Sequence, residues 1–341
     1  MLPEAVASAL DRMGVRVSDA ALLGGGISRN VNWSATWVSP GEPDRKVVIK
    51  LCREKTGDAL CQYVSAVNAA SIGSAPTPRV LAHSIPDGVI VLDWACGSVC
   101  DSDDLPDAHL APVGRALALL HKVDPPPSAP LVIDAGCSML CELEPTARIW
   151  AGNTGLPACC RSFARFALSE LASLPPISSF SSPAPGHRLS LLHCDVFPDN
   201  VVVDGQSVTL IDMEETCVAW RVLDIGAALM GVALLPLSSA DLDGLDEEAG
   251  LPQSVSDAWL GQMHRVRAVI EAYGEAASPP LTDEEKRAVP DAARMAALAL
   301  AFWRFRAFNW PNEAAEERQR KRYLEMLLRC RFVAQFAHLF I

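Results

Sequence analysis

The spacing of hydrophobic positions divides the chain into two parts. In residues 1–97, short apolar runs alternate with turns around one helical stretch, which is the pattern of strands in a small sheet. From residue 98 onward, apolar residues recur at helical spacing, apart from one pair of β-branched runs near residue 205. We therefore predict an α+β fold with a β-rich N-terminal lobe over residues 1–97 and a larger, mainly helical lobe over residues 98–341.

Seven stretches of the chain have helical periodicity outside the first-lobe helix. Residues 1–15 are expected to form an amphipathic helix, since Glu4 and Asp11 do not fit a signal peptide. A later helix is predicted to be broken or kinked at Pro290, because proline removes a backbone donor inside a helix. The helices predicted for the second lobe are 110–121, 144–174, 222–235, 254–277, 283–310 and 314–340.

The polar residues of greatest chemical interest lie around the β-branched pair. His193, Asp195 and Asn200 are spaced as H-x-D-x-x-x-x-N, and Asp212 follows the second run. Phosphoryl transfer from ATP needs a carboxylate beside the attacking hydroxyl and oxygen ligands that hold Mg²⁺ on the phosphates. The spacing predicts Asp195 as the base, Asn200 and Asp212 as metal ligands, and His193 as a brace for the loop. The alternative is that these are ordinary loop residues and that Asp212 caps the next element.

A hairpin between the two runs explains how the metal ligands would meet. Asp204 and Gly205 are a turn-forming pair. Folding the runs about Gln206 places Asn200 opposite Asp212, and opposed residues of an antiparallel pair have Cα atoms roughly 4.5–5.5 Å apart. The same register pairs Val203 with Thr209 and Val201 with Ile211.

Two features of the N-terminal part fit nucleotide binding. Gly25 and Gly26 lie in a turn followed by Ser28 and Asn30, and glycines let backbone N–H groups approach phosphate oxygens. Lys50 lies inside an apolar β run. Alone, the first feature is typical of a plain turn and the second of a solvent-facing lysine. Their order before the H-x-D-x-x-x-x-N segment matches protein-kinase-like enzymes, so we predict that Lys50 contacts the α/β-phosphates.

Together these segments resemble the superfamily of small-molecule kinases that includes aminoglycoside phosphotransferases, choline kinases and a homoserine kinase. The resemblance covers most of the chain. It implies a protein-kinase-like two-lobe fold and ATP- and Mg²⁺-dependent phosphorylation of a small-molecule hydroxyl. Residues 91–97 look like the lobe hinge, which implies that the backbone around Asp93 and Ala95 meets adenine. His121 ends a segment similar to the family's L-x-x-L-H helix and is expected to be structural.

Within the superfamily the sequence signals divide. Residues 193–201 are similar to the homoserine-kinase pattern H-A-D-L-F-x-D-N-V, and residues 297–306 resemble that group's A-L-R-F-W helix. Residues 212–226 look instead like the choline-kinase stretch D-F-E…R-x-x-D-I-G, with Glu214 where homoserine kinases usually carry an aromatic residue. We favour an amino acid such as homoserine as substrate, with choline, ethanolamine or an aminoglycoside as alternatives.

The two kinds of substrate require different pockets. A carboxylate calls for a guanidinium in a bidentate contact, whereas a quaternary ammonium calls for aromatic faces. The candidates are Arg304 and Arg306 for the carboxylate, and Trp220, Trp303, Trp310, Glu214 and Glu215 for the cation. The ordinary interpretation is that these side chains only pack in the core or lie at the surface.

One departure from the family pattern concerns Lys50. Kinases of this fold pair the lysine with a Glu on the first-lobe helix. Within residues 53–72 the acidic residues are Glu54 and Asp58, both early, while Gln62 lies nearer the expected place. The acidic partner therefore stays open. The alternative from another functional class is a non-catalytic pseudokinase that binds nucleotide. The presence of Lys50, Asp195, Asn200 and Asp212 argues against it.

Composition narrows the range of partners. The 341 residues carry a formal net charge of −12, which argues against nucleic acid or an anionic membrane as the main partner. The longest apolar runs fall short of the ~20 residues of a transmembrane helix, so we expect no membrane insertion. The eleven cysteines include two C-x-x-x-C pairs but are expected to be free thiols in a reducing cytoplasm. A small hydroxylated molecule is the expected partner, and nothing in the sequence indicates an oligomeric state.

Overall fold

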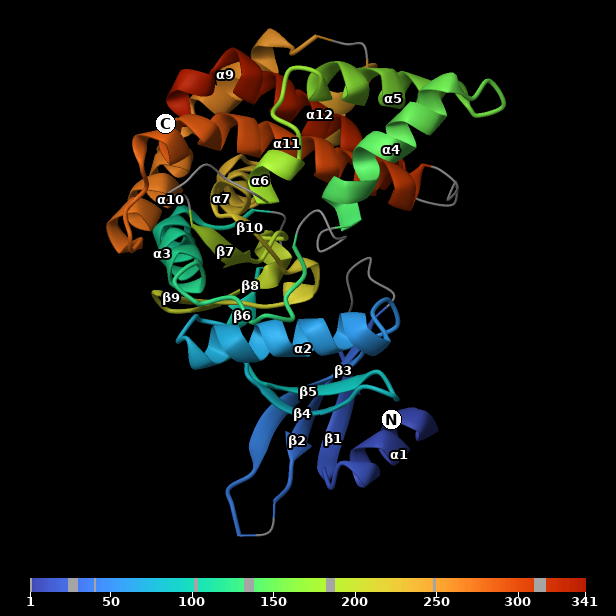
Figure 1. Cartoon of the computed structure of the whole chain (residues 1–341), viewed down its shortest axis with the longest axis vertical. Coiled ribbons are helices and arrows are strands. Elements are labelled where there is room, and N and C mark those ends of the chain that lie inside the picture. The colour runs from blue at the N-terminus through green and yellow to red at the C-terminus, as the bar shows by residue number, and fades with distance from the viewer. Residues whose placement is uncertain are drawn as a thin grey trace.

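The computed structural model describes residues 2–23, 30–39, 41–100, 104–131, 138–181, 188–247, 250–309 and 317–341. A small antiparallel sheet lies at one end of the molecule and a larger helical part at the other (Figure 1). This arrangement confirms the predicted α+β fold. The exact lobe boundary near residue 97 stays a prediction.

The N-terminal part is built on a five-stranded sheet in the order β1-β2-β3-β5-β4, in which every neighbouring pair is antiparallel. An amphipathic helix precedes it, as predicted from the acidic and apolar spacing of the first residues. A second helix, α2, lies between the sheet and the helical part (Figure 1). The elements are α1 Glu4–Arg12, β1 Val17–Leu22, β2 Val31–Trp37, β3 Arg45–Leu51, α2 Gly57–Ile72, β4 Val80–Ser84 and β5 Val89–Asp93.

Alternation along β3 explains where its lysine points. Val47 and Ile49 are buried in the cluster that the sheet forms with α1. Successive strand residues face opposite sides of a sheet, so Lys50 faces α2. Its register partner Ile90 packs in the cluster formed with α2. Lys50 is only 3% exposed, so the interpretation of a solvent-facing lysine is wrong.

The helical part packs around the long helix α11, which contacts α4, α7 and α12, while α3 packs against α10. Short strands near its centre form the pairs β7–β10, β6–β8 and β8–β9. The helices are α3 Leu110–Leu120, α4 Ser138–Gly152, α5 Ala158–Leu171, α6 Ser178–Ser181, α7 Val222–Ala228, α8 Ser239–Leu242, α9 Gln253–Leu260, α10 Met263–Ala276, α11 Asp283–Phe308 and α12 Glu317–Gln335. The strands are β6 Ser98–Val99, β7 Leu189–Leu192, β8 Val201–Asp204, β9 Ser207–Leu210 and β10 Cys217–Trp220.

Two predicted helices are wrong as single elements. The stretch 144–174 forms α4 and α5, separated where Gly155 and Pro157 favour a turn. The stretch 254–277 forms α9 and α10, separated at Gly261 and the residue after it. In both cases the apolar period continues across the break, so periodicity alone does not reveal it.

Two further predictions for helices need correction. The helix is not broken at Pro290, because α11 continues through this residue, whereas the kink predicted as the alternative stays a prediction. The stretch 222–235 begins as α7 but passes into a π-helix, Leu229–Ala233. No feature of the apolar spacing distinguishes a π-helix from an α-helix here.

A buried ion pair joins the start of α7 to the start of α11. Arg221 Nε lies 2.7 Å from Glu285 Oε1, and both side chains are almost fully buried. Burial alone would raise the pKa of Glu285, but hydrogen bonds from Arg221 and the Thr282 amide outweigh it and lower the pKa. The pair therefore stabilises the fold above the unfolded pKa of about 4.3, and this contribution is lost as pH falls through the lower folded pKa.

We expect Glu285→Gln to lower the free energy of unfolding by about 3–5 kcal/mol at neutral pH, because it leaves a buried guanidinium without its countercharge. The difference in the free energy of unfolding between the variant and the wild type should shrink as the pH falls below about 4, because the wild-type carboxylate then becomes protonated. Urea unfolding followed by circular dichroism at several pH values measures both effects. Asp283→Asn is the matched control, because Asp283 is an exposed carboxylate in the same helical turn. Its Oδ1 lies 3.9 Å from Lys286 Nζ, so the pair is exposed and long.

Candidate active site

The loop between β7 and β8 carries the H-x-D-x-x-x-x-N residues. Burial lowers the pKa of His193, so its imidazole is neutral at neutral pH. Its Nε2–H donates to the Ile211 carbonyl at 2.9 Å, and its Nδ1 accepts from the Asp195 amide at 3.3 Å. Cys194 has a positive φ of 65°, which is uncommon for a residue other than glycine. His193 thus links this loop to the end of β9, the bracing contact that was predicted for it.

Asp224 of α7 is the main anchor of this loop. Its two carboxylate oxygens accept the backbone amides of His193 and Cys194, each at 2.8 Å. It also lies 3.0 Å from Nε2 of His121, whose Nδ1 lies 2.8 Å from the hydroxyl of Tyr273. Burial alone would raise the pKa of Asp224, but these hydrogen bonds outweigh it and lower the pKa. The sequence interpretation noted the R-x-x-D-I-G stretch and gave its Asp no role in the site.

Asp195 and Asn200 are in direct contact. Asn200 Nδ2 donates to the backbone carbonyl and to a carboxylate oxygen of Asp195, both at 2.9 Å. Burial, followed by the charges of Asp212, Glu215 and Asp199, raises the pKa of Asp195 well above its ordinary value. Several carboxylates therefore concentrate negative charge around the half-buried Asp195.

The predicted hairpin exists, but its predicted register is wrong by one residue. The observed pairs are Val201 with Leu210, Val202 with Thr209, Val203 with Val208 and Asp204 with Ser207. The turn is tighter because Gly205 takes a positive φ of 59°, which glycine adopts readily. Asn200 therefore lies opposite Ile211, whose amide donates to the Asn200 carbonyl at 3.0 Å. Asp212 follows with a left-handed backbone, φ 59° and ψ 57°.

Lys50 reaches this segment from the other part of the molecule. Its Nζ lies 2.7 Å from Asp212 Oδ1 and also forms an ion pair with Glu214. Its Nζ lies 5.7 Å from the ring centroid of Tyr63 on α2. Burial alone would lower the pKa of Lys50, but the neighbouring carboxylates outweigh it and raise the pKa. The acidic partners of Lys50, which the sequence left open, are therefore Asp212 and Glu214, just beyond the hairpin.

Of the predicted nucleotide-loop residues, Gly25, Gly26 and Ser28 lie outside the described residues. Asn30 is described, and its Oδ1 accepts the Arg53 amide at 2.6 Å. Its Nδ2 donates to Glu214 Oε1 at 2.5 Å. Asn30 thus joins the chain after the Gly-rich turn to the same carboxylate that pairs with the strand lysine.

The predicted hinge follows β5. The carboxylate of Asp93 accepts from Arg45 Nε at 3.0 Å and lies 3.4 Å from Arg79 Nη2. Ala95 is half-buried between β5 and β6. The Asp93 side chain is thus bound to arginines and its amide donates to the Arg79 carbonyl at 2.8 Å, so the contact of this segment with adenine stays a prediction.

The predicted substrate residues lie in different environments. Arg304 is half-buried, with its guanidinium carbon 5.3 Å from the ring centroid of Phe197 in the catalytic loop. Arg306 is exposed and pairs with Glu142. Trp303 is 36% exposed and packs edge-on against Phe308.

Trp220 is buried, and its indole packs against Phe180 while Nε1 donates to Glu285 at 3.2 Å. It takes part in the contacts around the Arg221–Glu285 pair. Trp310 lies outside the described residues.

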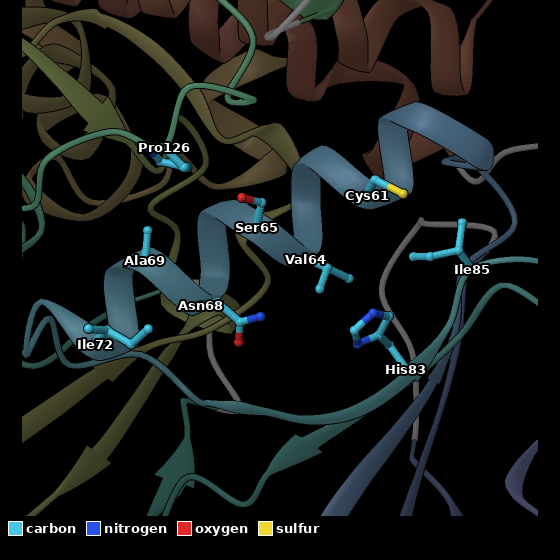
Figure 2. A pocket seen from close by; sticks show the side chains of 9 residues that line it. All are labelled: Cys61, Val64, Ser65, Asn68, Ala69, Ile72, His83, Ile85 and Pro126. Carbon is cyan, nitrogen blue, oxygen red and sulfur yellow. The ribbon is translucent and has the colours of Figure 1, made fainter.

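A surface pocket of about 440 Å³ lies between α2 and the segment around β4. Figure 2 shows Val64 and Asn68 of α2 facing His83 and Ile85 across it. None of the residues that line it belongs to the catalytic loop or carries the lysine. The candidate site is therefore a different place, defined by side-chain contacts at the junction of the two parts.

None of the cysteines in the part of the chain that the structure describes forms a disulfide. Within those same residues, no cluster of three or more His, Cys, Asp or Glu side chains is suited to a metal ion. That the C-x-x-x-C cysteines are reduced thiols stays a prediction, and Cys137 lies outside the described residues.

Residues 30–237 match the Phosphotransferase enzyme family, a segment that runs from Asn30 through Lys50, the catalytic loop and α7 to the residues after the π-helix. The match covers more than half of the chain. The chain therefore belongs to the Phosphotransferase enzyme family, as the sequence resemblance predicted.

A homoserine kinase of Gluconacetobacter diazotrophicus is 32% identical over 232 residues, which cover 66% of this chain and 60% of the relative. The chain thus matches less than two thirds of that relative's length. Among solved structures, a choline/ethanolamine kinase family protein of Mesorhizobium loti has a TM-score of 0.57 at 15% identity. The alignment covers 94% of this chain and 90% of the Mesorhizobium loti chain. An amicoumacin kinase in complex with AMP-PNP, Ca²⁺ and its ligand has a TM-score of 0.59 at 11% identity, covering 93% and 88%. These likenesses confirm the predicted kinase-like fold.

No helix within the described ranges is both long enough and apolar enough to cross a bilayer.

Proposed function

We propose that the protein is an ATP- and Mg²⁺-dependent phosphotransferase that phosphorylates the hydroxyl of a small molecule. One observation carries this proposal. Asn200 holds Asp195 by a hydrogen bond, Lys50 of β3 pairs with Asp212 just beyond the hairpin, and the charge of Asp212 acts on Asp195, so these four residues meet at the junction of the two parts. These are the base, metal-ligand and phosphate-binding groups that phosphoryl transfer requires.

We assign the general base to Asp195. Burial and the neighbouring carboxylates raise its pKa, which makes its carboxylate a stronger base toward the proton of a hydroxyl. Asn200 holds the Asp195 carboxylate by hydrogen bonding, and Asp224 fixes the backbone on which it stands. The acid is thereby oriented before any substrate arrives.

The donors at the site fit Mg²⁺. This ion binds through one or two carboxylates, water and substrate phosphates, and does not need a full protein cage. Asp212 supplies a carboxylate oxygen, and Asn200 supplies an amide oxygen because its Nδ2 is already bound to Asp195. When bound, the ion would neutralise the charge that develops on the transferred phosphoryl group.

Nucleotide contacts are assigned to the N-terminal part. Lys50 is held by Asp212 and Glu214 with its ammonium at the junction, where it can bind the α- and β-phosphates. Asn30 lies at the end of the Gly-rich turn and is joined to Glu214. The hinge around Asp93 and Ala95 remains our proposal for the adenine contact. The AMP-PNP in the similar amicoumacin kinase agrees with a nucleotide cofactor.

We propose an amino acid such as homoserine as the acceptor. The similarity to a homoserine kinase supports this choice. So does the position of Arg304, whose guanidinium stacks on Phe197, two residues after the proposed base. A guanidinium at that position can bind a substrate carboxylate in a bidentate contact.

We expect Arg304→Met to raise the KM for L-homoserine by roughly 10-fold or more, since a charge-assisted hydrogen bond is worth about 1.5–3 kcal/mol. Arg306→Met is the matched control, because Arg306 is exposed and paired with Glu142. Steady-state kinetics of both variants with L-homoserine provide the measurement. Equal KM values in the wild type and in Arg304→Met would rule out the assigned carboxylate contact.

Choline or ethanolamine is the second candidate, favoured by the similarity in fold to a choline/ethanolamine kinase. Two of the groups predicted to bind an amine are engaged elsewhere, since Glu214 pairs with Lys50 and Trp220 is buried against Phe180. A panel of L-homoserine, L-serine, choline, ethanolamine and an aminoglycoside, each assayed with ATP and Mg²⁺, distinguishes the candidates. The highest kcat/KM for L-homoserine is expected, and the highest value for an amine without a carboxylate would reject the amino-acid proposal.

The eleven cysteines, an odd number, support our proposal of a reducing cytoplasmic compartment. The pseudokinase alternative predicts nucleotide binding with no transfer to any member of that panel.

A further inference from the structure

The helix that anchors the catalytic loop touches it at two places. Asp224 holds the loop by the amides of His193 and Cys194. Gly231 meets the loop again, because a Cβ built on it would lie 1.9 Å from the carbonyl oxygen of Val196. Seven positions separate Asp224 from Gly231, and both residues lie against the same loop. Asp195 lies between the two contacted segments.

Gly231 stands in the middle of the π-helix Leu229–Ala233, all of whose residues are buried. Short π-helical turns are rare and occur frequently at functional sites. The carbonyls of this turn are bound by arginines of distant helices. Arg265 of α10 donates to Val232 at 3.1 Å and to Ala233 at 3.0 Å, and Arg329 of α12 donates to Met230.

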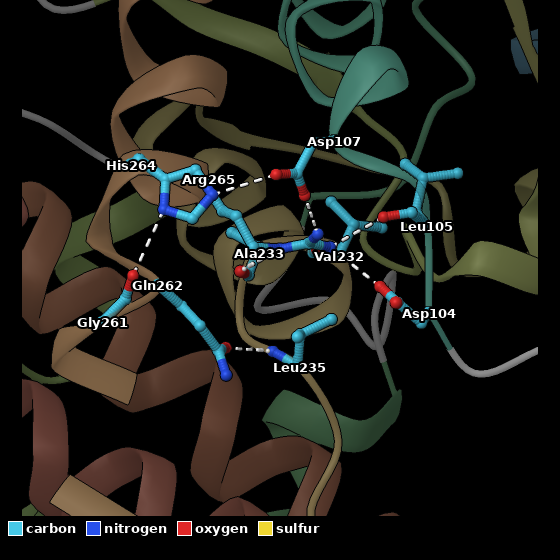
Figure 3. Close-up of polar contacts among 10 residues, drawn as sticks. All are labelled: Asp104, Leu105, Asp107, Val232, Ala233, Leu235, Gly261, Gln262, His264 and Arg265. Carbon is cyan, nitrogen blue, oxygen red and sulfur yellow. Dashed lines mark hydrogen bonds and ion pairs between the residues drawn. The ribbon is translucent and has the colours of Figure 1, made fainter. Parts of the chain in front are cut away.

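Arg265 is itself firmly held, as Figure 3 shows. It is 3% exposed, donates to the Leu105 carbonyl at 2.7 Å and to Asp104 at 3.0 Å, and pairs with Asp107. Gln262, on the turn before α10, accepts the Leu235 amide at 2.7 Å. The π-helix is therefore fixed by contacts that do not involve the catalytic loop, so it can act as a support for that loop.

We propose that Gly231 is a positioning residue for the catalytic loop. Because it has no side chain, the π-helix backbone meets the Val196 carbonyl and sets the position of the segment between Asp195 and Asn200. Any Cβ at this position must push Val196 away. The kinetic consequence rests on the proposed phosphotransferase function, whereas the structural consequence does not.

Gly231→Ala tests the proposal, with Gly88→Ala as the matched control. A Cβ at Gly88 would lie 2.8 Å from the carbonyl oxygen of Cys52. It is thus also a close backbone contact, but in the N-terminal part, away from the π-helix and its arginines. Hydrogen–deuterium exchange of peptides spanning residues 193–200 is measured in the folded, full-length variants. Exchange is expected to rise in Gly231→Ala and to match the wild type in Gly88→Ala.

Kinetics supply the second readout, with ATP, Mg²⁺ and L-homoserine as the probes. The kcat of Gly231→Ala, corrected for folded protein, should fall by roughly 10–100-fold, because a displacement of about 1 Å in a catalytic group can cost about 100-fold. The KM for ATP should stay within about threefold, since the lysine lies on β3. A loss of folded protein alone would leave the corrected kcat unchanged.

Two results would overturn the proposal: wild-type exchange at residues 193–200 in folded Gly231→Ala, or equal exchange in both glycine variants. If Gly231→Ala does not fold, Arg265→Lys takes its place, since it keeps the charge but loses the double hold on Val232 and Ala233. Faster exchange at residues 193–200 supports the proposal, and unchanged exchange rejects it. If the wild type transfers no phosphate to L-homoserine, the proposed substrate fails while the exchange result still decides the role of Gly231.

Discussion

Replacing Asp195 with Asn is expected to lower kcat by about 10²–10⁴-fold, the usual contribution of a general base. The substitution keeps the size of the side chain and the contact with Asn200, but it removes the group that accepts the proton. The KM for ATP should change little, because the nucleotide contacts are assigned to the N-terminal part. Steady-state kinetics with saturating ATP and Mg²⁺ measure the effect.

Asp199→Asn is the matched control for this change. Asp199 is an exposed carboxylate on the same loop, and its charge is one of those that raise the pKa of Asp195. We expect its kcat to stay within about threefold of the wild type, as for a surface charge that is largely screened. If Asp195→Asn turned over as fast as Asp199→Asn, the assignment of the base would be wrong.

Replacing Asp212 with Ala is expected to abolish turnover while the protein stays folded. The side chain is partly exposed, so its removal leaves no large cavity, but Lys50 loses its 2.7 Å contact and the proposed metal loses a carboxylate. A metal ion is worth several kcal/mol of transition-state stabilisation, which corresponds to a loss of roughly 10³-fold or more. Turnover and circular dichroism of the same samples separate a catalytic from a folding defect.

Asp204→Ala controls for changes to the hairpin, since Asp204 is exposed at its tip. Isothermal titration of Mg²⁺ with AMP-PNP adds a binding readout. Affinity for the metal–nucleotide pair should fall in Asp212→Ala and not in Asp204→Ala. Unchanged affinity and turnover in Asp212→Ala would contradict its assignment as a metal ligand.

The sequence was sufficient to predict the parts of the site that depend on short-range spacing. The H-x-D-x-x-x-x-N loop, the hairpin after it and the strand that carries Lys50 all follow from local patterns of polar and β-branched residues. The hairpin register was wrong because a positive φ at Gly205 permits a turn one residue shorter than the one assumed.

The parts that the sequence did not reveal depend on contacts between distant residues. The acidic partners of Lys50 come from beyond the hairpin, more than 160 positions away. The role of Asp224 in holding the catalytic loop follows from its contacts with the loop amides and with His121, which no local sequence pattern predicts. The π-helix depends on arginines of α10 and α12, which no periodicity within residues 222–235 can indicate.

Transfer of the γ-phosphate of ATP to L-homoserine tests the central claim most directly. The wild type, Asp195→Asn and Asp212→Ala are incubated with ATP, and the phosphorylated product is measured by mass spectrometry with Mg²⁺ or with EDTA. The account predicts Mg²⁺-dependent product in the wild type and almost none in either variant. A folded wild type that transfers phosphate to no hydroxyl compound of the panel, or variants that form product as fast as the wild type, would contradict it.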